Sequence, residues 1–311
     1  NWNTPQTVTL AAAEDADLAN GSAVFDVTST GLTTVSVTGT EADNDTQSLV
    51  VSSTSLSVTE GLTNTFTVRL AYQPSGNVTV AVARASGDSD LTVSGGASLT
   101  FTSANWNTTQ TVTLTAAEDV DTANGSAVFD VTSAGLTTVS VTGTEVDNDT
   151  QSLVVSSTSL SVTEGLTNTF TVRLAYQPSG NVTVAVARAS GDTDLTVSGG
   201  ASLTFTSANW NTPQTVTLAA AEDIDTANGS AVFDVMSSGL TTVSVTGTEA
   251  DNDTQSLVVS STSLSVTEGL TNTFTVRLAY QPAGNVTVAV ARASGDTDLT
   301  VSGGASLTFT S

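Results

Sequence analysis

The sequence contains no cysteine, no histidine and no lysine among its 311 residues. Without cysteine there is no disulfide framework, so a stable secreted array needs another means of holding its parts together. The absence of lysine also excludes lysine–asparagine isopeptide crosslinks. Zinc, copper and haem sites lack their usual ligands, and enzymes of the common classes lack their usual base or nucleophile partner. We therefore expect a protein that is not an enzyme.

Positive charge is scarce as well. Six arginines face 30 Asp and Glu residues, which gives a net charge of −24. Such a balance argues against nucleic acid or an anionic membrane surface as a partner, and it favours divalent cations. No apolar run approaches the length of a membrane span, so no direct membrane contact is expected in this segment.

An internal repeat organises the chain. NWNTPQTVTL at residue 1 returns with one change at residue 105 and unchanged at residue 209, a period of 104 residues. This period is too long for a solenoid unit and fits one independent domain per copy. Because the chain starts without methionine and in the middle of a copy, we expect a window of a longer array. The expected parts are a C-terminal half-repeat (1–46), two complete repeats (47–150 and 151–254) and an N-terminal half-repeat (255–311).

Alternating apolar and polar residues dominate each copy, which is typical of half-buried β-strands. About seven antiparallel strands with regular turns in about 100 residues predict an all-β fold of tandem immunoglobulin-like sandwiches. The first strand is expected to break at Ser52–Ser53, and the fourth to consist of two short segments. The expected strands of the copy 47–150 are 48–60, 65–72, 77–85, 91–94 with 98–103, 111–116, 127–133 and 137–145.

The acidic residues gather in particular turns. Antiparallel strands alternate in direction, so the turns after the first, third, fifth and seventh strands fall at one end of the sandwich. Nine of the ten Asp and Glu residues of the copy 47–150 lie there, and the tenth, Asp130, lies in the outward register of the sixth strand. The predicted site residues of the two complete repeats are Glu60, Asp88, Asp90, Glu118, Asp119, Asp121, Glu145, Asp147, Asp149, Glu164, Asp192, Asp194, Glu222, Asp223, Asp225, Glu249, Asp251 and Asp253.

Carboxylates gathered at one tip repel one another unless a cation lies among them. Oxygen ligands suit Ca²⁺, which takes six to eight of them, whereas Mg²⁺ prefers fewer protein ligands and more water. We therefore predict about two or three Ca²⁺ ions at each junction of repeats. The simpler alternative is that the acidic turns are only solvated. The segment EDVDTANGS (118–126) is not an EF-hand loop, because its spacing is one residue too long and it lacks the final Glu.

Five segments follow the order that is typical of one family: SVTEG (57–61), SGDSDLT (86–92), ASLTFTS (97–103), TVTLTAAED (111–119) and EVDND (145–149). They resemble the Calx-β domain pattern over the whole 104-residue copy. The resemblance implies Ca²⁺ at one tip, and tandem copies resemble the extender arrays of large bacterial surface adhesins. The implied ligands are Glu60, Asp88 or Asp90, Glu118, Asp119, Asp121, Asp147 and Asp149.

One departure from that pattern leaves the number of ions open. The second acidic pair of the family, after the fifth strand, is replaced here by Thr122–Ala123–Asn124–Gly125.

The acidic tip lies where one repeat leads into the next, so Ca²⁺ bound there would hold consecutive repeats at a fixed angle. A linker held only by solvent would leave the array flexible. An alternative to packing across the junction is that Trp106 and its copies cover only the cores of their own repeats. We expect Arg84 and Arg188 to form salt bridges near the acidic cluster. The residues expected to pack between repeats are Tyr72, Trp106, Leu136, Tyr176, Trp210 and Leu240.

These features favour an extracellular or cell-surface structural protein, a Ca²⁺-rigidified rod or fibre of bacterial origin that serves as an adhesin stalk or surface filament. Its expected partners are neighbouring repeats and other copies in a fibre. One rival is a module that binds carbohydrate or ice through outward Thr rows, although few aromatics are available for sugar stacking. Another is a filament subunit in which the half-repeats 1–46 and 255–311 complement each other head to tail. Glycosylation at Asn44, Asn77 or Asn107 remains open.

Overall fold

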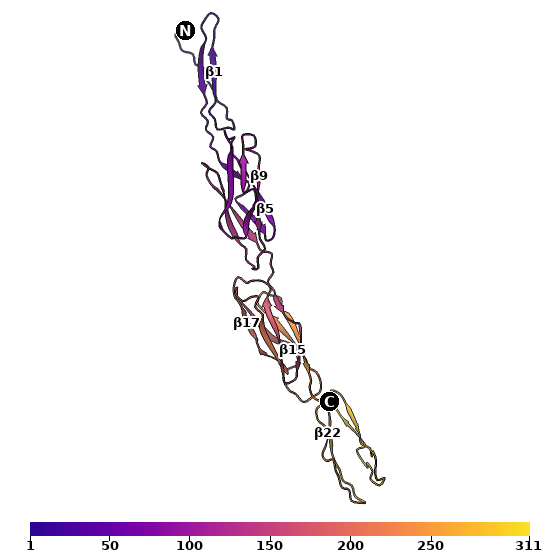
Figure 1. Ribbon diagram of the computed structural model, residues 1–311. Helices are drawn as coiled ribbons and strands as arrows, with labels where there is room; N and C mark the ends of the chain where they lie inside the picture. Colours follow the sequence, from indigo (N-terminus) through magenta and orange to yellow (C-terminus); the bar gives the residue numbers. More distant parts are fainter. The chain divides into compact units, whose positions relative to one another are not determined.

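The computed structural model describes all 311 residues and is all-β, with 24 strands and no helix. It therefore has no helix that could cross a membrane. The all-β fold predicted from the alternating pattern is confirmed. The chain divides into two compact units, Asn1–Asp149 and Thr150–Ser311, and each contains one complete β-sandwich (Figure 1).

The sandwich of the first unit consists of two sheets. One has four strands in the order β3-β5-β9-β7, and the other has five in the order β4-β11-β10-β6-β8. In the four-stranded sheet, β5 and β9 run side by side with Phe66 opposite Val112. The strand bounds are β3 (Leu49–Val51), β4 (Ser55–Thr59), β5 (Thr63–Leu70), β6 (Val78–Gly87), β7 (Leu91–Gly95), β8 (Ser98–Phe101), β9 (Gln110–Ala116), β10 (Ser126–Thr132) and β11 (Val139–Val146).

The core lies between the two sheets and follows the period of two. Phe66, Val68 and Leu70 of β5 and Phe129 and Val131 of β10 are buried, while the residues between them are more exposed. Each such side chain contributes roughly 1.5–3 kcal/mol by leaving water. The core is aliphatic and aromatic throughout, so it holds the sheets together and leaves the charged residues to the turns.

The nine strands correspond to the seven expected ones, because the first is broken at Ser52–Ser53 and the fourth consists of two segments, as expected. At both of these places the chain crosses from one sheet to the other. After the break at Ser52–Ser53, β4 joins the other sheet and pairs in parallel with β11, with Val58 opposite Glu145. Between β7 and β8, Gly96 adopts a φ of 73°, which favours glycine. The first crossing matters for function because it sets Glu60 beside the end of β11.

The second unit contains a sandwich of the same topology, with sheets β12-β14-β18-β16 and β13-β20-β19-β15-β17. Its core repeats the same pattern, with Phe170, Phe205 and Phe233 fully buried. The strand bounds are β12 (Leu153–Val155), β13 (Ser159–Thr163), β14 (Thr167–Leu174), β15 (Val182–Gly191), β16 (Leu195–Gly199), β17 (Ser202–Phe205), β18 (Gln214–Ala220), β19 (Ser230–Met236) and β20 (Val243–Ala250).

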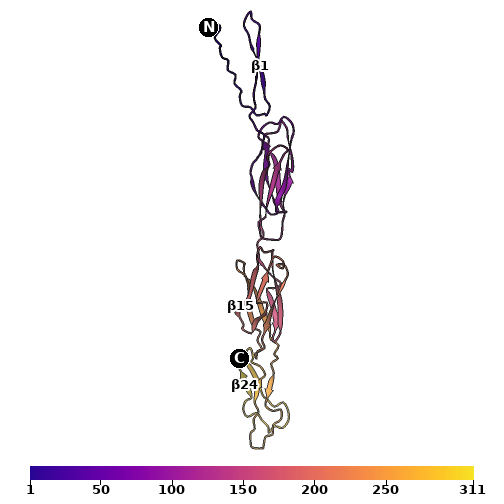
Figure 2. The same ribbon diagram turned by 90° about the vertical axis from the view of Figure 1, so that its left-hand side faces the viewer.

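The residues before and after the two sandwiches form only two-stranded sheets. The hairpin of β1 (Ser22–Val27) and β2 (Val35–Thr40) lies near the N-terminus (Figure 2). Near the C-terminus, β21 (Leu257–Val259) pairs with β22 (Val276–Leu278), and β23 (Val286–Ala289) with β24 (Ser306–Phe309). The division of the chain into two complete repeats and two half-repeats stays a prediction.

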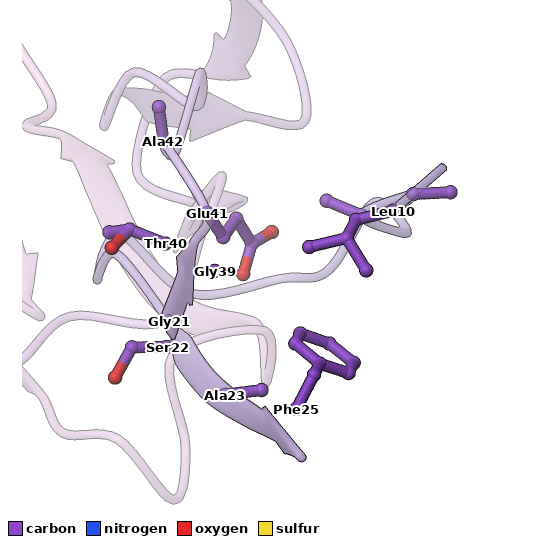
Figure 3. A pocket seen from close by; sticks show the side chains of 11 residues that line it. Leu10, Gly21, Ser22, Ala23, Phe25, Gly39, Thr40, Glu41 and Ala42 are labelled. Carbon is purple, nitrogen blue, oxygen red and sulfur yellow. The ribbon is translucent and has the colours of Figure 1, made fainter. Parts of the chain in front are cut away.

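An open groove marks the apolar face of the N-terminal hairpin. Its volume is about 510 Å³, and Figure 3 shows the side chains of Leu10 and Phe25 at its rim. Phe25 is 44% exposed. Leu114 and Phe129, at the equivalent positions of the complete sandwich, are fully buried. The groove thus corresponds to a part of the core that the second sheet covers in the complete sandwich.

Candidate metal centre

Four acidic turns of the first sandwich meet at one tip. Glu60 follows β4, Asp88 follows β6, Asp119 lies after β9, and Glu145 is the second-to-last residue of β11. Backbone contacts draw these ends together: Glu60 N donates to Val146 O (3.0 Å), and Glu145 N donates to Gly125 O (2.9 Å). The tip is therefore built by the ends of strands from both sheets.

Two groups of carboxylates at this tip have the spacing of metal ligands. One consists of Glu60, Asp119 and Glu145, and the other of Glu60, Asp147 and Asp149, each with ligand oxygens within 4.8 Å of one another. Glu60 belongs to both groups, so its carboxylate is shared by two adjacent candidate metal positions. At an effective dielectric constant of about 20, two unit charges at this separation repel by roughly 3 kcal/mol. Three or more such charges favour a cation between them.

The carboxylates of Glu60 and Glu145 are buried, and three of their four oxygens have no hydrogen-bond partner. Glu145 is 1% exposed and Glu60 is 2% exposed. Burying an ionised carboxylate without a partner costs several kcal/mol. Yet the buried side-chain oxygens without a hydrogen-bond partner are all carboxylate oxygens of these tips: Glu60 Oε2, both oxygens of Glu145 and of Glu249, and Oδ2 of Asp147, Asp149, Asp251 and Asp253.

The electrostatics of the tip raise carboxyl pKa values. Burial, followed by the neighbouring carboxylates of Asp88 and Asp119, raises the pKa of Glu145 to about 7. In the second sandwich, burial and then the carboxylates of Asp223 and Asp192 raise the pKa of Glu249 to about 7. Near neutral pH these two carboxyl groups therefore bind a proton more readily than an ordinary glutamate, and a cation bound here would compete with that proton.

Asp88 lies against the backbone of the turn after β9. A Cβ atom added at Gly125 would lie 1.6 Å from Asp88 Oδ2 and 2.6 Å from Glu145 Oε2. Glycine at this position therefore leaves the space in which the two carboxylates meet. This glycine belongs to the segment Thr122–Gly125, which replaces the second acidic pair of the Calx-β pattern.

Short side-chain-to-backbone hydrogen bonds hold the acidic turns in shape. Asp119 Oδ1 accepts from Asp121 N (2.7 Å), and Asp121 Oδ1 accepts from Ala123 N (2.7 Å). Such turns order a loop locally. Glu60 also accepts a short hydrogen bond from Asp119 N, so the ends of β4 and β9 are joined directly.

Two asparagines that sequence reasoning did not select connect the end of β11 to the other turns. Asn124 Oδ1 accepts from Asp147 N (2.8 Å), and Asn148 Nδ2 donates to Glu60 O (3.1 Å). Their only signal in the sequence is their position among acidic residues. Both act on backbone groups, so they shape the tip without adding charge.

Some of the predicted site residues lie outside the two carboxylate groups. Asp90 and Asp121 are half-buried, and Asp121 caps its own turn. Glu118 is exposed, with its carboxylate against Gly61. Asp130 points outward from β10 and accepts a hydrogen bond from Ser140 Oγ (2.7 Å), as its register predicts.

The arginines near the tip interact differently from the expectation. Arg84 Nη1 donates to the carbonyl oxygens of Gly87 (3.3 Å) and Asp88 (2.5 Å), and Arg188 Nη1 donates to Asp192 O (2.5 Å). The expected salt bridges are thus replaced by contacts with backbone carbonyls. These side chains are exposed at the end of the strand, where the guanidinium reaches the turn backbone before any carboxylate.

The second sandwich repeats this tip. Glu164, Asp223 and Glu249 form the matching group of three, and Asp192 Oδ2 lies against Gly229. Asp223 N donates to Glu164. The remaining predicted residues keep the places of their counterparts: Asp194 donates its N–H to Asp192, Glu222 lies against Gly165, Asp225 caps its own turn, and Asp251 donates its N–H to Asn228.

The residues expected to pack between repeats fall into two sets. Trp106 and Leu136 pack against the core of the first sandwich, and Trp210 and Leu240 against that of the second. This placement matches the alternative in which the tryptophans cover their own cores. Tyr176 is half-buried, and its backbone is held by the side chain of Gln151.

Tyr72 makes a contact of another kind within the first unit. The neighbouring carboxylate of Asp45 raises the pKa of its hydroxyl. The next residue, Gln73, donates its N–H to Ala16 O (2.7 Å) and forms a parallel bridge with Asp17. Asp17 belongs to a third group of three carboxylates, with Asp15 and Asp43. The corner at Tyr72–Gln73 therefore touches the acidic turns of the segment that precedes it.

No family description matches the chain, and no curated protein matches its sequence. Solved structures are similar at low identity. Escherichia coli alpha-2-macroglobulin activated by porcine elastase aligns with 77% of this chain at 11% identity, with a TM-score of 0.24, and the chain spans 25% of that protein. Extracellular cadherin domains 1–4 of protocadherin gamma B7 align with 83% at 10% identity and a TM-score of 0.35, the chain spanning 66% of them. Dpr11 IG1 bound to DIP-gamma IG+IG2 aligns with 67% of this chain and 100% of that chain, at 12% identity and a TM-score of 0.32.

Proposed function

We propose that this chain is part of an extracellular structural rod or fibre of tandem β-sandwiches, rigidified by Ca²⁺ at the acidic tips. The observation that carries the proposal is the set of buried carboxylate oxygens without partners, all of which lie at these tips. A folded protein seldom leaves such oxygens without a partner, since each one costs free energy. Bound cations would supply the missing partners and balance part of the net charge of −24.

The chemistry of the donor set favours Ca²⁺. The tip offers carboxylate oxygens with neighbouring backbone carbonyls and no nitrogen or sulfur ligand, which suits a hard cation. The two groups that share Glu60 support two ions at the tip of the first sandwich, with Glu60 between them, and the group of Glu164, Asp223 and Glu249 supports one ion at the tip of the second. Ca²⁺ tolerates irregular ligand numbers, whereas Mg²⁺ requires a near-octahedral shell and keeps several waters. The finer resemblance to Calx-β domains is part of this proposal.

Rigidity would follow from the place of the ions. Asp147 and Asp149 belong both to the ligand group of Glu60 and to the segment by which the repeat ends. Binding them to ions fixes the path of that segment relative to the strands. Neighbouring repeats are therefore the proposed partners, with other copies alongside in a fibre. A bacterial cell surface, as an adhesin stalk or a surface filament, is the proposed setting.

Calcium titration of the full chain tests this function. We expect saturable heat of binding in calorimetry, weaker binding of Mg²⁺, and a higher melting temperature with Ca²⁺ than after chelation. A ligand at 100 times its Kd stabilises by about 2.7 kcal/mol, which corresponds to roughly 10 °C or more for a domain of this size. X-ray scattering should show a more flexible chain without Ca²⁺. An unchanged melting temperature after complete removal of metal would contradict the proposal.

A second candidate function is assembly between copies by strand complementation, and the groove at Leu10 and Phe25 favours it. Residues 255–311 differ from 47–103 at only two positions, Ala283 and Thr297. They also expose apolar side chains, with Phe274 42% exposed. Strands from this segment of a second copy fit the groove, because the same sequence fills the same core in the complete repeats.

Sedimentation velocity distinguishes this candidate. Concentration-dependent oligomers of the chain, abolished by Phe25→Asp, support complementation between copies. A monomer at all concentrations rejects it, and it leaves the calcium proposal untouched.

A further inference from the structure

An asparagine followed by glycine stands directly before each of the strands β1, β10 and β19. The pairs are Asn20–Gly21, Asn124–Gly125 and Asn228–Gly229, and no other asparagine of the chain precedes a glycine. All three lie in the acidic turn between the fifth and sixth expected strands of a repeat. The pair is therefore a feature of the repeat, in a place where an added charge matters.

Packing at the tip requires the glycine of this pair. A Cβ atom at Gly125 would lie 1.6 Å from Asp88 Oδ2, and one at Gly229 would lie 1.7 Å from Asp192 Oδ2. The same absence of a side chain leaves the glycine nitrogen uncrowded and its backbone free to rotate. An asparagine before such a nitrogen is able to cyclise, so the packing of the tip brings a reactive pair with it.

Cyclisation is a reaction of the chain with itself and with water. The Gly125 nitrogen gives up its proton and bonds to Cγ of Asn124, while the bond from Cγ to Nδ2 breaks and this nitrogen leaves as ammonia. Water then opens the resulting succinimide ring at either of its two carbonyls. One opening gives aspartate, and the other gives isoaspartate, in which the main chain runs through the side-chain carbon. Both products carry a carboxylate in place of the amide.

In the folded tip, hydrogen bonds to the end of β11 hold both residues of the pair. Asn124 Oδ1 accepts from Asp147 N (2.8 Å), and Gly125 O accepts from Glu145 N (2.9 Å). The second sandwich has the same two contacts. Ring closure requires the asparagine side chain to turn back toward the glycine nitrogen. The contact with Asp147, 23 positions along the chain, must therefore break before the ring forms.

We propose that Asn124 and Asn228 are sites of self-modification, which convert to aspartate or isoaspartate when the turn that contains them opens. The products alter the tip, because a new carboxylate joins those already gathered there. Isoaspartate also lengthens the main chain by a methylene group at the place where Asp88 packs on Gly125. Since ammonia is lost, conversion is not reversed when the turn closes, and it records how often a tip has opened. The inference does not depend on bound Ca²⁺.

Asn20 provides a comparison within the same chain. Its Oδ1 accepts from Asp43 N (2.8 Å), so the local contact is the same. The strands β1 and β2, however, form a sheet of only two strands, and the residues of β1 are exposed. An isolated hairpin is marginally stable in water. The turn at Asn20 should therefore open more often than the turns of the two complete sandwiches.

Incubation of the full chain at mildly alkaline pH, followed by mass spectrometry of the peptides that cover 14–22, 118–126 and 222–230, tests the inference. The three peptides differ at their third residue, so each site is followed separately. In the folded chain we expect the first site to convert fastest and the other two at least about fivefold more slowly, since one hydrogen bond changes an equilibrium by about that factor. In denaturant all three should convert at one rate.

Hydrogen exchange of the Asp147 and Asp251 backbone amides measures the same opening independently, because these amides donate to the two asparagines. Exchange and conversion should rise in the same proportion as denaturant is added below the unfolding transition. Conversion of Asn124 and Asn228 that is as fast in the folded chain as in denaturant would overturn the inference. Conversion that does not follow the exchange of these amides, or sites that stay unmodified in denaturant, would overturn it as well.

Discussion

The Asp88 carboxylate rests directly on the backbone of Gly125, with Oδ2 1.6 Å from the place that a Cβ atom would occupy. A side chain of any size at this position must move Asp88, and Glu145 behind it. We predict that Gly125→Ala weakens Ca²⁺ binding at the tip of the first sandwich by roughly tenfold or more, because two of its carboxylates leave their positions. Calorimetric titration of the full chain measures the change.

Gly76→Ala is the matched control for this substitution. Gly76 lies in the turn between β5 and β6, with no atom within 4 Å of an added Cβ. It should leave Ca²⁺ binding unchanged. Similar losses in both variants would show that the close approach of Asp88 has no special importance.

Glu145→Gln should have opposite effects on stability and on metal binding. Without Ca²⁺ at pH 7.5, removal of a buried charge that has no partner should raise the melting temperature by several degrees, because roughly 1 kcal/mol or more of desolvation and repulsion is relieved. Ca²⁺ binding should weaken, since a carboxylate ligand is lost. Thermal melts with and without Ca²⁺ measure both effects, and a variant less stable in both conditions contradicts this account.

The pH dependence of the metal-free chain follows from the raised pKa of Glu145 and Glu249, both about 7 against an ordinary value of 4.5. Between these values the folded chain binds more protons than the unfolded chain, so stability falls as pH rises. The contribution is fully present below pH 4.5 and is lost above about pH 7. We expect the melting temperature to fall over this range without Ca²⁺ and not with saturating Ca²⁺, where the metal replaces the protons. A rise with pH in the metal-free chain would refute the assignment.

The substitutions Asp119→Asn and Asp130→Asn each remove one charge from the same repeat, the first at the acidic tip and the second on strand β10. Asp119 belongs to the carboxylate group with Glu60 and Glu145, whereas Asp130 lies on β10 and accepts a hydrogen bond from Ser140. We predict about tenfold weaker Ca²⁺ binding for Asp119→Asn and little change for Asp130→Asn. Equal effects would mean that net charge alone, rather than the tip, attracts the ion.

The sequence predicts the fold and the common location of the acidic turns well, because both depend on a period of two and on strand direction. Phe66 and Phe129 lie in the core as the alternation requires. Which carboxylates meet depends instead on rotamers and turn shapes. Glu118 and Asp119 are adjacent, yet one is exposed beside Gly61 and the other faces Glu60. That Asp119 and Glu60 are ligands stays a prediction.

Other parts of the site follow from contacts between distant segments, which no local pattern encodes. The crossing of β4 to the five-stranded sheet sets Glu60 beside Glu145, and it depends on a parallel pairing that the expected antiparallel order did not include. Trp106 is expected at the junction because its turn lies at the end of the sandwich opposite the acidic tip. It packs on its own core, as the alternative expects, and packing between repeats stays a prediction. Tyr72 is expected to pack between repeats, which stays a prediction, and the neighbouring Asp45 carboxylate raises the pKa of its phenol.

The pairing of Gln151 with Tyr176 has a consequence for how such arrays change in length. The same pairing joins Gln47 to Tyr72 and Gln255 to Tyr280. Every copy therefore carries the same glutamine–tyrosine pairing near its start. A gene that gains or loses one whole period keeps this pairing in each copy, so recombination between copies alters the number of repeats without requiring any compensating substitution in it.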